Sequence, residues 1–209
     1  MVHKTNHLEN KMKKYLLLTF VTLIILLSSC SQKNNKLTIE YNKSLVKSDP
    51  NKVIVQINID SISDFKMFQE RIQSAVCAKE IPVILFQIND TIKKIYTTEF
   101  CWDYLDNISY KARNNIDILD DVIRKDEKIY SLDSLCNLMK KDFLNYGKNP
   151  NFSDHPENLI VNISYTSKEF NNLKFLLNRI TNCYDNLGMK TQLNFNFIEV
   201  IFPKLKPNI

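Results

Sequence analysis

The sequence is short of glycine, proline and histidine, and these shortages exclude several kinds of protein. Its 209 residues contain two Gly, six Pro and three His. Two glycines leave little room for a loop that cradles phosphate groups, and neither a P-loop nor a GxGxxG pattern occurs. With 44% hydrophobic and 24% charged residues, the composition also excludes collagen-like chains, low-complexity disorder and polytopic membrane proteins.

A strong excess of positive charge is also missing from most of the chain. The formal net charge is +5, but residues 1–29 hold four Lys and one Glu. Residues 30–209 therefore carry 24 basic and 22 acidic groups, with the two signs interspersed. This balance gives no electrostatic basis for binding nucleic acid, so no nucleic-acid partner is predicted.

No apolar run reaches the length of a comfortable membrane span. The longest, Tyr15–Leu27, follows Lys11, Lys13 and Lys14. As a helix it covers about 20 Å, against about 30 Å for the hydrocarbon core of a bilayer. A basic segment followed by a short apolar run is the layout of a signal peptide, so residues 1–29 are predicted to be one. An uncleaved anchor helix is the alternative.

The tetrapeptide that ends this run, Leu27-Ser28-Ser29-Cys30, resembles the lipobox of bacterial lipoproteins. The resemblance implies diacylation of the Cys30 sulfur, cleavage before Cys30 and acylation of the new amino group. Two or three acyl chains give stable anchoring, so membrane lipid is an expected partner through Cys30. Residues 30–36 are polar and non-acidic, and we expect a flexible tether. The expected location is the periplasmic side of a bacterial membrane, the outer membrane in particular.

Four further cysteines are available for disulfides in such an oxidising compartment. Cys77, Cys101, Cys136 and Cys183 allow three pairings, among which spacing cannot choose. Buried free thiols are the alternative. We predict one pairing, Cys136 with Cys183, because both lie on apolar stripes of helices expected side by side on one sheet face.

Two segments, at about 52–89 and 158–198, each predict a β-α-β unit. In the first, the alternating residues Val53, Val55, Ile57 and Ile59 share one face, and Ser61 is expected to cap the next helix. In the second, the inward set is expected at Leu159, Val161, Ile163 and Tyr165, with Thr166 as the cap and Glu169 three residues on. Either an old duplication or shared periodicity alone accounts for the likeness of the units.

The predicted fold is α+β, two-layered, with small mixed sheets and helices on one face. Between the units, residues 99–126 are expected to form short helix. The folded part is divided into an N-terminal α/β part, residues 37–126, and a C-terminal α+β part, residues 127–209.

The order of elements over residues 127–201 resembles the periplasmic domain of the ExbD/TolR family. The matching pieces are Lys128–Tyr130, the helix with Leu132, Leu135 and Met139, Leu159–Ile163, the helix from Phe170 to Leu187, and Leu193–Phe197 after the turn at Gly188. Members of that family carry an uncleaved transmembrane helix with a proton-carrying Asp. Here Tyr15–Leu27 has no such residue and ends in a lipobox, so the resemblance implies a domain that acts by binding alone.

Candidate chemistry is sparse in this sequence. After Cys30 the only histidine is His155, which could bind a metal with Asp154 and Glu157 or pair with a cysteine; a solvated loop is favoured. Asp117, Asp120 and Asp121 lie at helical spacing and could collect a cation, but a solvated helical face is favoured. Phe100, Trp102 and Tyr104 could line a sugar- or peptide-binding surface, but core packing is favoured.

The sequence therefore predicts a lipid-anchored binding or scaffolding lipoprotein without catalytic activity, cofactor or metal, with an envelope protein as a further expected partner. One alternative is an accessory subunit of an ExbD/TolR-type energy-transduction complex. A second alternative is an envelope hydrolase with an unrecognised site, for which turnover lost in His155→Ala would be the evidence.

Overall fold

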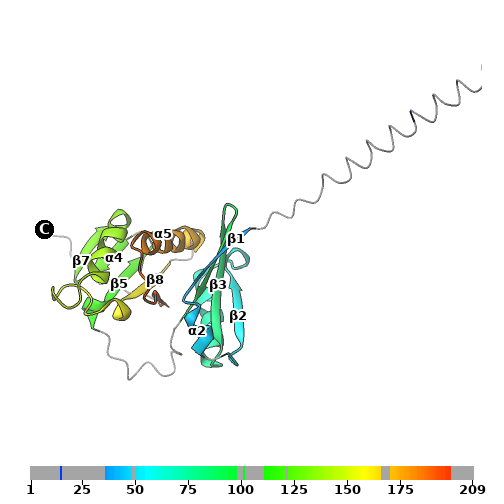
Figure 1. Cartoon of the computed structure of the whole chain (residues 1–209), viewed down its shortest axis with the longest axis horizontal. Coiled ribbons are helices and arrows are strands. Elements are labelled where there is room, and N and C mark those ends of the chain that lie inside the picture. The colour runs from blue at the N-terminus through cyan, green and yellow to red at the C-terminus, as the bar shows by residue number, and fades with distance from the viewer. Residues whose placement is uncertain are drawn as a thin grey trace, which may run out of the picture. The chain divides into compact units, whose positions relative to one another are not determined.

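The computed structural model describes residue 15 and residues 36–48, 50–97, 101, 111–120, 122–165 and 170–198 (Figure 1). The chain divides into two units, Met1–Lys36 and Leu37–Ile209, and the second is the folded part discussed below. Within the described residues, no helix is both long and apolar enough to cross a membrane. The lipobox cysteine, Cys30, lies outside the described residues.

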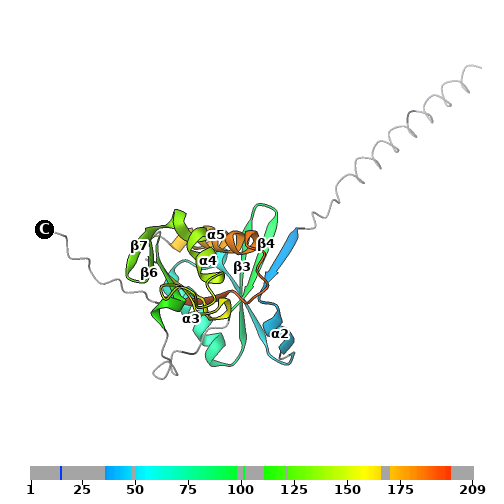
Figure 2. The ribbon, with the colours of Figure 1, turned by 60° about the vertical axis from the view of Figure 1, so that its left-hand side comes forward.

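The fold is α+β, with two small mixed sheets. The first sheet has the strand order β1 (Leu37–Tyr41), β4 (Thr91–Tyr96), β3 (Ile81–Ile88) and β2 (Ile54–Asn58). The second has the order β7 (Lys128–Ser131), β6 (Val122–Lys125), β5 (Asn115–Leu119), β8 (Ile160–Ser164) and β9 (Asn194–Phe197). The α-helices are α2 (Ser44–Ser48), α3 (Phe65–Cys77), α4 (Leu135–Phe143) and α5 (Leu173–Asn186). Figure 2 shows α4 and α5 side by side.

The first β-α-β unit is present as β2, α3 and β3, with β2 and β3 parallel. The apolar stripe of α3 buries Phe65, Phe68 and Ile72 in the core. The sequence predicts Ser61 as the cap of this helix, and this prediction is wrong. The cap is Asp64, whose carboxylate accepts a hydrogen bond from the Met67 N–H at 2.8 Å. The reason is that residues 59–61 form a separate 3-10 turn, which moves the start of α3 by three residues.

The second unit is β8, α5 and β9, again with parallel strands. The expected inward set of β8 is buried, as are Leu173, Leu177 and Ile180 on α5. The expected cap, Thr166, and Glu169 lie outside the described residues.

The described part of the stretch expected to form short helix, residues 99–126, contains one turn of 3-10 helix, Ala112–Asn114, followed by a β-hairpin. Its strands β5 and β6 pair antiparallel and join the second sheet. Ile116, Ile118 and Ile123 are fully buried. Burial of apolar residues at the strand period of two therefore determines the structure here, and the helical spacing of the acidic residues does not. The expected boundary after residue 126 lies in the turn from β6 to β7, where Asp126 has a φ of 49°.

The two sheets share one hydrophobic core. Phe68 on α3 packs edge-on against Phe197 on β9, with ring centroids 5.0 Å apart. Lys93 on β4 donates hydrogen bonds to Thr181 and Asn182 on α5, at 2.8 and 2.7 Å. On the face of the first sheet opposite α3, Leu45 and Val46 of α2 pack against Ile81, Val83 and Tyr96 and cover part of the face; α2 is not predicted from the sequence.

Candidate functional site

The four outer strands of the two sheets differ in how their free edges are protected. The edge of β9 is closed by side-chain amides: Asn42 donates to the Leu193 carbonyl and accepts from its N–H, and Gln69 donates to the Phe197 carbonyl. Among the other outer strands, β1 contains Glu40 and β7 contains Lys128. Charged residues on an edge oppose pairing with another chain.

β2 is the outer strand on the other side of the first sheet (Figure 1), and among the described residues neither a charged residue of the strand nor a side-chain amide protects its edge. Its sequence, Ile-Val-Gln-Ile-Asn, contains neither a charged residue nor proline. The Ile81 N–H donates to the Val53 carbonyl, so the backbone groups of the odd-numbered residues bond β3. The N–H and C=O groups of Ile54, Gln56 and Asn58 therefore point away from the sheet. The Asn58 carbonyl accepts a hydrogen bond from the Ser61 hydroxyl at 2.8 Å, so the open part of the edge is formed by Ile54 and Gln56. An open strand edge of this kind can accept an added strand.

The exposed side chains of this segment are both apolar, at Val53 and Ile54, and polar, at Gln56 and Asn58. Val53 is 58% exposed and Ile54 is 41% exposed, while Ile57 and Ile59 are buried. The sequence predicts that Val53, Val55, Ile57 and Ile59 share one face of a strand. In the structure only Val55 and Ile57 belong to β2, because the strand begins at Ile54 and Ile59 starts the 3-10 turn. Because β2 is an outer strand, its early residues have a neighbour on one side only.

Two surface hollows flank the ends of β2. The hollow at its beginning, about 390 Å³ in volume, is lined by residues that include Leu45, Lys52, Val76, Lys79 and Ile81. The hollow at its end, about 360 Å³, is lined by Ile59, Asp60, Ile62, Phe170, Asn171, Lys174 and Phe175. We define the β2 edge and these two hollows as the candidate binding surface.

The second hollow combines an exposed aromatic ring with an ion pair. Lys174 donates to Asp60 at 3.0 Å, and its ammonium lies 5.6 Å from the centre of the Phe175 ring. Phe175 is 59% exposed. Such a surface can bind by apolar contact and by charge, and the groups present offer no nucleophile with an adjacent base.

We expect Phe175→Ala to change the free energy of unfolding by less than about 0.5 kcal/mol, since an exposed side chain away from the core contributes little. The matched control is Phe68→Ala, which removes a fully buried ring and is expected to cost about 3–5 kcal/mol. Chemical denaturation of both variants measures the difference. A cost above 2 kcal/mol for Phe175→Ala would show that this ring supports the fold and is not a surface available for binding.

The loop that contains Asp154, His155 and Glu157, called the histidine loop below, places the Asp154 carboxylate against cationic side chains. Asp154 binds two cations, with its carboxylate oxygens 3.1 Å from the Lys111 ammonium and 2.9 Å from the Arg113 guanidinium. The Lys111 hydrogen bond and the charge of Arg113 lower the pKa of Asp154 below its ordinary value. His155 packs edge-on near Tyr146. Within the described residues no cluster of three metal-ligating side chains occurs.

The acidic set does not lie on a helical face. Asp117 is on β5, where its Oδ2 accepts from Arg124 at 2.7 Å and its Oδ1 accepts from Asn162 at 2.7 Å. Asp120 is in the hairpin turn with a φ of 52°, and Asp121 lies outside the described residues. Phe100, Trp102 and Tyr104 lie outside them as well.

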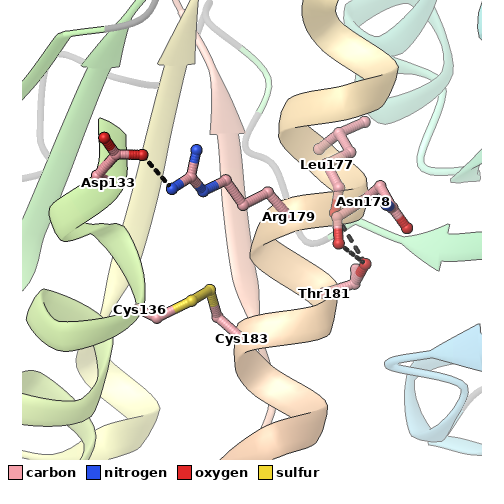
Figure 3. The surroundings of a disulfide bond; sticks show 7 residues. All are labelled: Asp133, Cys136, Leu177, Asn178, Arg179, Thr181 and Cys183. Atoms are coloured by element: carbon pink, nitrogen blue, oxygen red, sulfur yellow. Dashed lines mark hydrogen bonds and ion pairs between the residues drawn. A yellow bond between two sulfur atoms is a disulfide. The ribbon is translucent and has the colours of Figure 1, made fainter. Parts of the chain in front are cut away.

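The structure contains two disulfides, Cys77–Cys101 and Cys136–Cys183. The second joins the two residues that the sequence analysis pairs, and it links α4 to α5 across a Cα separation of 5.1 Å (Figure 3). In each bridge one cysteine is buried and the other is exposed, Cys136 included, although the sequence predicts it on the apolar stripe. Nearby, Arg179 on α5 donates to Asp133 at 2.7 Å, which ties α5 to the 3-10 turn Leu132–Ser134 that precedes α4.

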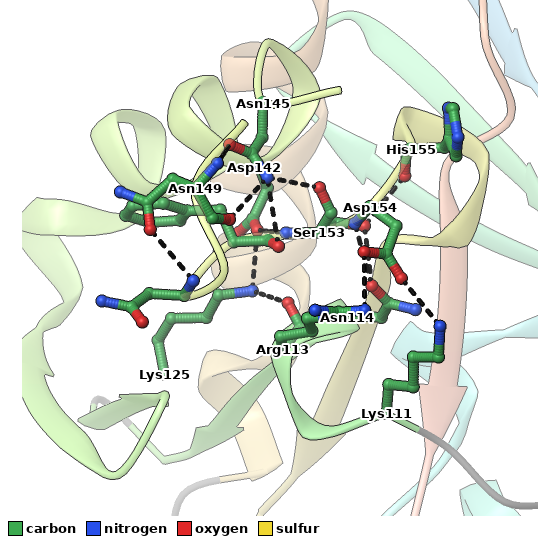
Figure 4. Close-up of polar contacts among 12 residues, drawn as sticks. Lys111, Arg113, Asn114, Lys125, Asp142, Asn145, Asn149, Ser153, Asp154 and His155 are labelled. Atoms are coloured by element: carbon green, nitrogen blue, oxygen red, sulfur yellow. Dashed lines mark hydrogen bonds and ion pairs between the residues drawn. The ribbon is translucent and has the colours of Figure 1, made fainter. Parts of the chain in front are cut away.

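A buried ion pair, Lys125 with Asp142, holds the histidine loop to the second sheet (Figure 4). The Lys125 ammonium donates to Asp142 Oδ1 and to the Arg113 carbonyl, and the Ser153 N–H donates to the same Asp142 oxygen. Burial lowers the pKa of Lys125 and raises the pKa of Asp142. All the contacts of this pair are internal to the fold, so its role is structural.

Sequence reasoning missed the β2 edge as a candidate site. The available signal was a five-residue strand without charge or proline, which becomes meaningful only when the strand order is known. Comparisons with protein-family models, with curated proteins and with solved structures found no match.

Proposed function

We propose that this protein is a lipid-anchored binding or scaffolding protein of a bacterial envelope, without catalytic activity. The observation that carries the proposal is the segment from Lys11 to Cys30, a basic stretch and a short apolar run that end in Leu-Ser-Ser-Cys. The two disulfides support it, because disulfides persist in oxidising compartments such as the periplasm. The candidate binding surface is the part of the described chain that offers contacts to a partner.

We expect Cys30→Ala to remain unprocessed, because acylation requires the thiol and cleavage follows acylation. Intact-mass measurement of the protein extracted from bacterial membranes checks this. The wild-type chain should begin at Cys30 and carry acyl groups, and the variant should keep residues 1–29. Ser29→Ala is the matched control, since it keeps a small residue before the cut and should be processed normally. A Cys30→Ala protein of mature mass that stays in the membrane fraction would contradict the lipobox interpretation.

A second candidate function is an accessory role in an ExbD/TolR-type envelope complex. The observation that favours it is the order β7, α4, β8, α5, β9, which follows the order of elements on which the resemblance rests. Cross-linking in intact cells, followed by purification of the full chain, tests this role. Recovery of a motor protein of that class would support it, and recovery of no envelope partner would count against it.

A further inference from the structure

Each Asp-Ser or Asp-Thr pair of this chain is followed by an aliphatic residue. The resulting triplets are Asp60-Ser61-Ile62, Asp90-Thr91-Ile92 and Asp133-Ser134-Leu135. They resemble the Asp-Ser/Thr-aliphatic acceptor of a bacterial periplasmic O-glycosylation system. We propose that the hydroxyl groups of Ser61, Thr91 and Ser134 are acceptors for an O-linked sugar. This inference rests on the envelope location in the proposed function, and it adds a modification that the binding role does not require.

All three triplets lie in turns at the surface. Ser61 ends the 3-10 turn Ile59–Ser61, which precedes α3, and Ser134 ends the 3-10 turn Leu132–Ser134, which precedes α4. Thr91 is the first residue of β4, directly after the two-residue turn that joins this strand to β3. A transferase can therefore approach each triplet from solvent, as it could not in the middle of a central strand or a packed helix.

The acidic residue of each triplet is exposed, with side-chain exposures of 41% for Asp60 and 87% for Asp133. The aliphatic residue is buried in two of the triplets, at Ile62 and Leu135, and partly buried in the third. Each turn is therefore held to the fold by its aliphatic residue, with the acid outward. The hydroxyl is presented beside a carboxylate, and a transferase can recognise that carboxylate with a charge-assisted hydrogen bond.

Attachment of a sugar to these hydroxyls leaves the hydrophobic core intact. Ser61 is exposed, and Thr91 and Ser134 are partly exposed. The Ser61 hydroxyl donates a hydrogen bond to the Asn58 carbonyl at 2.8 Å. That bond is lost when the sugar replaces the proton, but Asn58 is exposed and water can donate to its carbonyl instead.

The step is a glycosyl transfer from a sugar carried on a diphosphate, which an envelope transferase would supply. The Ser or Thr oxygen attacks C1 of the sugar, so that a bond forms between C1 and this oxygen and the bond from C1 to the diphosphate oxygen breaks. The diphosphate leaves with the electron pair of the broken bond, and the hydroxyl proton passes to a base of the transferase. Nothing is oxidised or reduced, so the sugar diphosphate is the one co-reactant required.

Peptide mapping by mass spectrometry, on the full chain purified from its native membranes, tests the assignment. The peptides that contain Ser61, Thr91 and Ser134 should carry the mass of one or more sugar units, and alkali should release this mass by β-elimination. Ser63 and Ser131 are the internal controls, because both are exposed, lie close to two of the turns and lack a preceding Asp. Both should be unmodified.

Substitutions in the first triplet separate recognition of the triplet from exposure alone. Ser61→Ala should remove the sugar from this site, and Ser61→Thr should keep it, since the second triplet contains threonine. Asp60→Asn keeps the shape of the side chain and removes its charge. The fraction of Ser61 that carries sugar should then fall about tenfold, the loss expected for one hydrogen bond to a charged group. Ser63→Ala should change nothing.

Three results would overturn the proposal: no sugar at any of the triplets, an equal mass on Ser63 or Ser131, and an unchanged fraction of modified Ser61 in Asp60→Asn. The same spectra report the N-terminal peptide. An acylated Cys30 without sugar at the triplets would overturn this inference and leave the proposed function intact. A chain that keeps residues 1–29 would contradict the proposed function, and sugar at the triplets would still establish the modification.

Discussion

Replacing both Cys136 and Cys183 by alanine is expected to lower the free energy of unfolding by about 4 kcal/mol in the chain-entropy description of a disulfide. The bridge joins residues 47 apart in the sequence, and it therefore restricts a long segment of the unfolded chain. Denaturant titration of the oxidised wild type and of the double variant measures the loss.

The Cys77–Cys101 bridge provides the matched control, since it closes a shorter segment with a separation of 24 residues. Its removal is expected to cost about 3.5 kcal/mol, slightly less than the first. Reduction of the wild type should lower its free energy of unfolding to about that of a variant that lacks both bridges. A loss below 1 kcal/mol for the Cys136 and Cys183 double variant would contradict a linked α4 and α5.

The second large effect is expected from Lys125→Met. The side chains of Lys125 and Asp142 are 1% and 0% exposed, and their atoms lie 2.7 Å apart. Removing the lysine leaves a buried carboxylate without its counter-charge, which costs about 3–5 kcal/mol in such pairs. Thermal and chemical unfolding of the variant measure the change.

Two further variants separate this effect from a general cost of mutation. Lys125→Met combined with Asp142→Leu should recover most of the loss, because neither charge is then left alone in the core. Arg179→Met removes a pair of which the partner, Asp133, is 87% exposed; the expected cost is below about 1 kcal/mol. Equal losses for Lys125→Met and Arg179→Met would show that burial does not govern the effect.

The elements governed by a clear period could be predicted from the sequence. The stripes of α3 and α5 and the alternation in β8 lie where the apolar spacing places them, because burial of one face dominates local preference. The sequence predicts helix where the hairpin of β5 and β6 lies, since its acidic residues also fall at helical spacing. Their positions reflect a turn at Asp120, where the backbone is left-handed, and an outward strand position at Asp117.

The features that depend on tertiary placement could not be predicted. Lys125 and Asp142 are separated by 17 residues and belong to no sequence pattern, so nothing in the chain marks them as partners. The partner of Cys77 is likewise one of three possibilities until the fold is known. The open edge of β2 depends on strand order, which periodicity does not contain.

The contacts of β1 determine how the fold would respond to a pulling force. A load applied to the chain that precedes Leu37 enters the folded part at this residue, the first of β1. Because β1 runs parallel to β4 in register over five residues, a load directed along the strand is shared by the whole ladder at once. At the far end of β1, Tyr41 donates to Asp185 on α5, and Asn42 bonds both backbone groups of Leu193. Tension on the chain before β1 would therefore be transmitted to α5 and to the start of β9 through these hydrogen bonds.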